Sequence, residues 1–173
     1  MATGGGSGPG RRGHQKKDLE HVDGAAAALI VETLKIGAEA EAGACDLPNA
    51  ETRLRDASLG FAAKMVGAVM SGPLQRAAGV DAPPGRKELR TRSILSAVGE
   101  VSYTRWYTVD AKGTSQFPAD EALGLVFGCT PGAAKRLCHM GAKSQSYAEA
   151  SKSLELLSGL QASSNTIQRL VGV

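Results

Sequence analysis

Apolar side chains in the front part of the chain recur every three or four positions, which predicts two amphipathic helices. These helices span residues 18–43 and 51–71, and a Gly-Pro pair ends the second one. The intervening "CDLPNAE" interrupts the pattern, and Asn49 or Thr52 is expected to cap the second helix.

Apolar and polar residues then alternate in "LRTRSILSAVGEVSYTRWYT", residues 89–108, which predicts two strands around a Gly-Glu turn. One face of the second strand carries Val101, Tyr103, Arg105, Tyr107 and Val109. The other face carries Ser102, Thr104, Trp106 and Thr108. Trp106 thus stands among hydroxyl groups, where it either stacks on a base or is covered by a neighbouring helix.

Helical spacing returns after residue 129, with a start or stop signal at each end. Thr130-Pro131 is typical of a helix start, and Ser146 with Glu149 forms a capping box. Gly159 ends that second helix, and Ser163 or Ser164 caps a third. The expected inward side chains are Ala134, Leu137, Cys138, Gly141, Tyr147, Ala150, Leu154, Leu157, Ile167, Leu170 and Val171.

The expected fold is therefore mainly α. A disordered tail (1–17) precedes a helical pair (18–78), and a Pro/Gly hinge (79–88) leads to a short β-hairpin and loop (89–128). The chain closes with a helix-turn-helix-like three-helix unit, residues 129–173.

Charge is uneven along the chain. The net charge is +3, but residues 86–173 carry eleven Lys and Arg against seven Asp and Glu, whereas residues 1–50 carry five against seven. A local basic excess attracts polyanions by counterion release, and it is equally typical of a solvated face.

Cys45, Cys129 and Cys138 are widely spaced and form no Cys-x-x-Cys pair, which favours a reducing compartment over a disulfide framework. The N-terminus lacks the apolar stretch of a secretory signal, and "AAAALIV" is too short to cross a bilayer. We therefore expect a cytoplasmic protein without a membrane partner.

The last two helices and their glycine turn have the pattern of a DNA-binding helix-turn-helix, whose second helix enters the major groove. Asn and Gln side chains can pair with adenine, and Arg with guanine or a phosphate. The candidate contacts to double-stranded DNA are Arg92, Arg105, Trp106, Lys135, Arg136, Lys143, Ser164, Asn165, Gln168 and Arg169.

A catalytic site is not indicated by the sequence. It contains no P-loop, HExxH, GxSxG or glycine-rich nucleotide fingerprint. Asp110 and Asp120 lie near loops, Glu149 belongs to a cap, and no carboxylate pair has the spacing of a metal site. No catalytic or metal-binding residue is therefore assigned.

Three blocks occur in order: "GEVSYTRWY", "QFPADEALGL" and "SYAEASKSLELLSGLQASSNTIQRL". With them the chain from Arg92 to Val171, about half of its length, resembles the region ahead of the catalytic domain in ISKra-type bacterial insertion-sequence transposases. That resemblance implies DNA binding at the ends of a mobile element during transposition. Cutting and joining would need a ribonuclease-H-like domain with divalent metal ions, expected after Val173, so no cofactor is expected in this chain.

The sequence departs from this family at one motif. Members commonly carry Cys-x-x-Cys after the paired aromatics, where this chain has Val109 and Lys112. Zinc requires thiolate or imidazole ligands, so we expect a degenerate zinc-ribbon-like hairpin that binds no metal.

Two other interpretations of the chain remain open. Residues 18–71 could form a homo-oligomer, which would make the chain a non-catalytic helical oligomerisation module. The chain could also be a truncated, non-functional transposase remnant.

Overall fold

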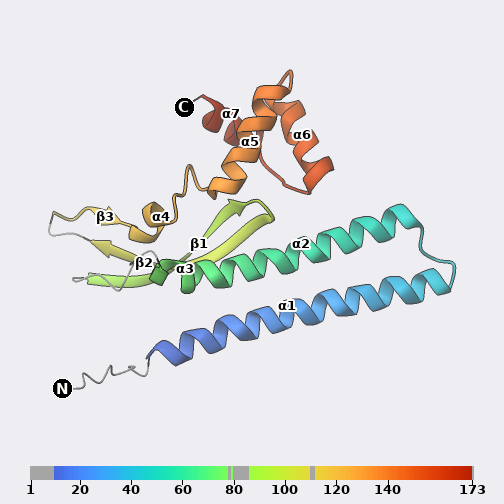
Figure 1. Cartoon of the computed structure of the whole chain (residues 1–173), viewed down its shortest axis with the longest axis horizontal. Coiled ribbons are helices and arrows are strands. Elements are labelled where there is room, and N and C mark those ends of the chain that lie inside the picture. The colour runs from blue at the N-terminus through green and yellow to red at the C-terminus, as the bar shows by residue number, and fades with distance from the viewer. Residues whose placement is uncertain (1–9, 78, 80–85, 110–111, 173) are drawn as a thin grey trace.

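Two long helices, a β-hairpin and a three-helix unit make up the protein (Figure 1). The computed structural model describes residues 10–77, 79, 86–109 and 112–172. As expected, this part of the chain is mainly helical, and its antiparallel sheet has the strand order β1-β2-β3.

Helices α1 (Gly10–Glu41) and α2 (Leu47–Ser71) lie antiparallel, side by side (Figure 1). The guanidinium of Arg53 on α2 bridges two carboxylates of α1, with Nη2 2.6 Å from Oε1 of Glu32 and a second ion pair to Glu39. Ile36 is buried in this contact. These ion pairs fix the register of the two helices, with Arg53 beside the turn of α1 that contains Ile36.

Both helices begin earlier than the sequence pattern indicated. α1 starts at Gly10, so residues 10–17 of the expected disordered tail are helical, and residues 1–9 lie outside the described residues. Asp46 caps α2, because its Oδ1 accepts the backbone N–H of Asn49 at 2.8 Å. The prediction of Asn49 or Thr52 as the cap is wrong, since both lie inside α2.

Strands β1 (Arg86–Ser96) and β2 (Gly99–Val109) pair along their full length, and β3 (Ser115–Gln116) adds a short third strand. The hairpin turn is Ala97-Val98, and Gly99-Glu100 instead begin β2. The side chain of Ser96 stabilises this turn, because its Oγ accepts the Val98 N–H at 3.2 Å. β1 also begins inside the expected hinge, of which residues 80–85 lie outside the described residues.

The hairpin packs on α2, on the side away from α1 (Figure 1). Val101 and Tyr103, which share one face of β2, are buried there. The helix approaches the strand closely at Gly67, where an added Cβ would lie 2.5 Å from the carbonyl oxygen of Ser102. A residue without a side chain is therefore required at this crossing.

The end of α2 and the short helix α3 (Pro73–Ala77) cover part of the free edge of β2. The hydroxyl of Ser71 accepts the N–H of Thr104 at 3.0 Å. The amide of Gln75 donates to the Thr104 carbonyl at 2.7 Å. Two side chains thus replace the hydrogen bonds that a neighbouring strand would make.

After the short helix α4 (Pro118–Ala122), three helices form the C-terminal unit: α5 (Pro131–Lys143), α6 (Tyr147–Ser158) and α7 (Ser164–Val171). Its buried core consists of Cys129, Ala133, Leu137, Ala150, Leu154, Leu160, Ile167 and Leu170. The expected caps are confirmed at Thr130, Ser146 and Ser163, and Gly159 ends α6 with a left-handed backbone at φ +67°. The prediction that Leu157 points inward is wrong, because its side chain is 75% exposed.

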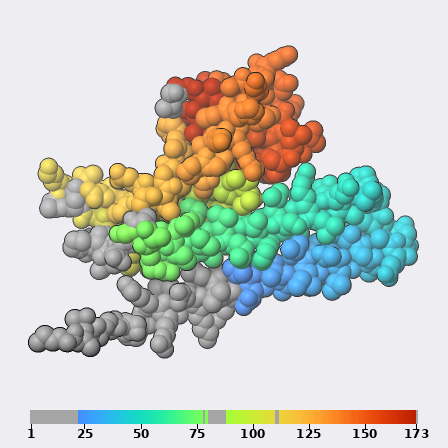
Figure 2. Space-filling model, in the orientation of Figure 1, coloured from blue at the N-terminus to red at the C-terminus, as the bar shows by residue number. Residues whose placement is uncertain are grey.

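The C-terminal unit contacts both the hairpin and α2. The backbone of Leu95 in β1 accepts from Thr130 at 2.8 Å and donates to Gly128 at 2.9 Å. At the other end of the unit, Gly159 lies against Leu59 of α2 so closely that an added Cβ would come within 2.6 Å of Cδ1. α2 therefore lies between α1 and the C-terminal unit (Figures 1 and 2).

Across the described residues, no helix combines the length and apolar character needed to cross a membrane.

Candidate nucleic-acid interface

Helix α7 presents a polar row on the side opposite its core contacts. Asn165, Gln168 and Arg169 are exposed, while Ile167 and Leu170 of the same helix are buried. The three polar side chains and Gly172 surround a shallow hollow of about 740 Å³. The prediction that Asn165, Gln168 and Arg169 point outward is confirmed. Three side chains with hydrogen-bond donors thus line one hollow on the same face of α7.

Close packing behind α7 holds this row in place. An added Cβ at Gly141 of α5 would lie 2.7 Å from methyl groups of both Ile167 and Val171. The hydroxyl of Ser163 accepts the N–H of Thr166 at 3.2 Å and fixes the first turn of α7. Ser164 is half-buried beside this cap, so it presents less surface than the three residues of the row.

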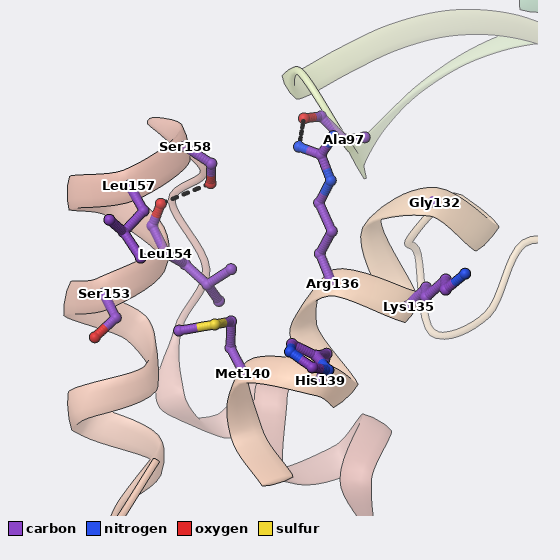
Figure 3. A pocket seen from close by; sticks show the side chains of 10 residues that line it. All are labelled: Ala97, Gly132, Lys135, Arg136, His139, Met140, Ser153, Leu154, Leu157 and Ser158. Atoms are coloured by element: carbon purple, nitrogen blue, oxygen red, sulfur yellow. Dashed lines mark hydrogen bonds between the residues drawn. The ribbon is translucent and has the colours of Figure 1, made fainter. Parts of the chain in front are cut away.

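The candidate cations of α5 are also exposed, but two of them face a different hollow. Lys135 and Arg136 line a groove between α5, α6 and the hairpin turn, together with His139 (Figure 3). The guanidinium of Arg136 donates to the Ala97 carbonyl at 2.9 Å across this groove. The groove shares no lining residue with the α7 hollow, so the structure does not bring these cations together with the polar row. Lys143, at the end of α5, lines neither hollow and is exposed.

The arginines of the hairpin converge on one carboxylate of α4. Asp120 accepts hydrogen bonds from the Tyr103 hydroxyl and from Nη1 of Arg105, and Nη1 of Arg92 lies 2.5 Å from its Oδ2. The guanidinium of Arg105 also stacks on the Phe117 ring, 3.7 Å from its centroid. This cluster joins the hairpin to the segment that follows it.

Arg105 is therefore not available to a phosphate. Its side chain is only 8% exposed, and a buried guanidinium needs its charge partner within the protein. Arg92 is half-buried in the same cluster and is partly committed to Asp120. Burial, reinforced by the hydrogen bond to Asp120 and its negative charge, raises the pKa of Tyr103 above its usual value. The hydroxyl therefore stays protonated and donates to the carboxylate.

Trp106 is half-buried on the opposite face of β2, across from Leu89 of β1. The sequence left open whether this ring stacks on a base or is covered by a neighbouring helix. Its partial exposure fits neither alternative fully, because the ring is neither enclosed in the core nor free in solvent. It also lies on the sheet rather than on the C-terminal unit that carries α7.

Sequence reasoning missed the structural role of Asp120, which it placed only near a loop. One signal was present, because Arg105 shares a face of β2 with the apolar Val101 and the aromatic Tyr103, and both of these are buried. A buried arginine requires an acidic partner, and Asp120 is close in sequence.

Within the described ranges, no three His, Cys, Asp or Glu side chains lie close enough to hold a metal ion. The Cys129 thiol is buried in the C-terminal core, and this burial raises its pKa, which disfavours the reactive thiolate.

No family model matches the chain, and no curated protein matches it in sequence.

Proposed function

We propose that this chain binds double-stranded DNA through α7, as the non-catalytic DNA-recognition portion of an ISKra-type transposase. The observation that carries the proposal is the exposed row Asn165, Gln168 and Arg169 on α7, the last of the three C-terminal helices. Recognition of the ends of a mobile element is inferred from the sequence resemblance alone.

The dimensions of α7 suit the major groove. An α-helix with its side chains is about 10–12 Å in diameter, and the major groove of B-form DNA is about 12 Å wide, so α7 fits across it. Asn165 and Gln168 can each donate to and accept from the major-groove edge of adenine, and Arg169 can donate twice to guanine. Base recognition by this row is therefore chemically direct.

Phosphate contacts would come from cations beside the row. In a helix-turn-helix the first helix crosses the backbone, a position that α6 would occupy with exposed Lys152. Lys143 at the end of α5 is a second exposed cation of the same unit. Arg105 is excluded by its burial, and Lys135 and Arg136 are left out because they line the separate groove.

Fluorescence anisotropy with labelled duplexes, titrated with the whole chain at several salt concentrations, tests this proposal. Affinity should fall steeply with salt, because cations release counterions from the phosphates. Arg169→Ala should cost about 1–3 kcal/mol on the preferred duplex and reduce the preference between sequences. Lys152→Ala should weaken binding to all duplexes alike and lower the salt slope.

Lys64→Ala on α2 is the matched control, because Lys64 is exposed on a helix outside the C-terminal unit. It should leave both affinity and salt slope unchanged. Affinity that does not respond to salt, or equal losses for Lys64→Ala and Lys152→Ala, would overturn the proposal.

A second candidate function is oligomerisation through the front helices, because α1 carries exposed aliphatic side chains. Ile30, Val31 and Leu34 are 60%, 48% and 68% exposed. Adjacent large apolar side chains in solvent are typical of a protein contact. This function is compatible with DNA binding, since α1 and α7 are separate elements.

A further inference from the structure

The groove between α5 and α6 is lined by two kinds of side chain (Figure 3). Its volume is about 630 Å³, and Met140, Leu154 and Leu157 line it with apolar surface. Lys135 and Arg136 at its edge supply positive charge. An apolar groove with a basic edge favours an amphipathic helix that carries acidic residues over a bare phosphate backbone.

The exposed aliphatic side chains of α1 belong to a longer row. Ala27, Ile30 or Val31, Leu34 and Ala38 are exposed at spacings of three and four, so they share one face of the helix. Exposed Asp23 and Glu41 extend this α1 row at its two ends. The row lies on the side of α1 opposite Ile36, which is buried against α2.

The α1 row and the groove complement each other in shape and charge. Helices that bind in grooves use anchors at positions i, i+3 or i+4, and i+7, which is the spacing of the row. Of the four acidic residues in 22–41, Glu32 and Glu39 are already paired with Arg53 of α2. Asp23 and Glu41 remain against one exposed cation, Lys35, whereas Lys135 and Arg136 make the groove lining basic. Two α1 rows placed face to face would bring acidic ends into the same contact, which is less favourable.

The two surfaces of one molecule cannot meet. α1 packs on α2, and α2 packs on the hairpin and touches the C-terminal unit at Gly159 (Figures 1 and 2). α1 and the groove therefore lie on opposite sides of α2, and only a second molecule can bring a row to a groove.

We propose that the α1 row of one copy docks in the α5–α6 groove of a second copy. This inference rests on the oligomerisation proposed above and does not depend on DNA binding. The contact joins two different surfaces, so it either closes into a dimer with two such contacts or continues from copy to copy.

Sedimentation velocity of the whole chain over a range of concentrations tests this docking with two charge substitutions. Leu34→Glu places a carboxylate in the row, and Leu157→Glu places one in the groove. Each variant alone should weaken self-association by about tenfold or more, because one buried leucine is lost from the contact. An equimolar mixture should form a one-to-one complex through a single contact, since the Leu157→Glu copy keeps an intact row and the Leu34→Glu copy keeps an intact groove.

Leu47→Glu is the matched control, because Leu47 is exposed at the start of α2 and belongs to neither surface. It should associate as the unsubstituted chain does, and circular dichroism should show unchanged helix content for all three variants. If Leu157→Glu associates normally while Leu34→Glu does not, oligomerisation stands but the groove is not its partner. A chain that stays monomeric at every concentration would overturn both proposals.

Discussion

Asp120 is the residue on which the hairpin and the following segment most depend. A single carboxylate accepts from Tyr103, Arg92 and Arg105, and Arg105 is nearly enclosed. Removing the acidic partner of a buried ion pair is costly, because the remaining charge keeps its desolvation penalty. The stability of this region should therefore be sensitive to the charge at residue 120.

Asp120→Asn should lower the free energy of unfolding by about 3 kcal/mol, because it leaves the Arg105 guanidinium buried without a counter-charge. Urea denaturation measures this change. Asp56→Asn is the control, since Asp56 pairs with Arg55 on an exposed stretch of α2 and should change stability by less than about 0.5 kcal/mol. Equal effects of the two substitutions would contradict the role assigned to Asp120.

Within α2, two glycines differ in what surrounds them. An added Cβ at Gly67 would meet the Ser102 carbonyl oxygen at 2.5 Å, whereas nothing lies within 4 Å of one at Gly60. Both positions lie inside the same helix, so their intrinsic helix propensities are comparable. Substituting each of them by alanine therefore separates the effect of close packing on stability from the effect of helix propensity.

Gly60→Ala should stabilise the protein by about 0.5–1 kcal/mol, because alanine favours the helix. Gly67→Ala should destabilise it, since either the strand must move away or the helix must shift. Thermal unfolding of both variants followed by circular dichroism gives the two signs. A stabilising Gly67→Ala would show that α2 and β2 are not in close contact at this crossing.

The three C-terminal helices could be placed from the sequence because their ends carry local signals. Thr130, Ser146, Ser163 and Gly159 act through their own backbone and the next few residues, so spacing alone identifies them. The same local reasoning gave the outward direction of Asn165, Gln168 and Arg169.

Errors arose where partners lie far apart in sequence. Leu157 has the helical spacing of a core residue, but α5 and α7 cover only part of α6 and leave the Leu157 side chain in solvent. Arg105 was assigned to a phosphate by residue type, whereas its exposure is set by Asp120 and Phe117, beyond the strand. The hairpin turn depended on a side-chain hydrogen bond of Ser96, which a glycine-based rule does not capture.

The molecule is built outward from α2, and its parts should differ in how readily they open. α1 contacts α2 along one side, and Ile36 is the only buried large apolar side chain among those described on α1. α2 is packed on both sides. Local unfolding of α1 should therefore require less free energy than unfolding of α2.

Hydrogen exchange measured by mass spectrometry should show faster exchange of backbone amides in α1 than in α2 in dilute solution. Exchange in α1 should slow as concentration rises, because docking buries the α1 row, and this slowing should be absent in Leu34→Glu. Equal protection of both helices in dilute Leu34→Glu would contradict the expected order of opening.

The edge of β2 that is covered by Ser71 and Gln75 limits how these molecules can aggregate. An uncovered strand edge is a template to which a strand of another chain can add, and repeated addition produces fibrils. Here both backbone groups of Thr104 are already bonded to side chains at the end of α2 and in α3. Even when α1 opens, we expect the middle of β2 to remain closed to such growth.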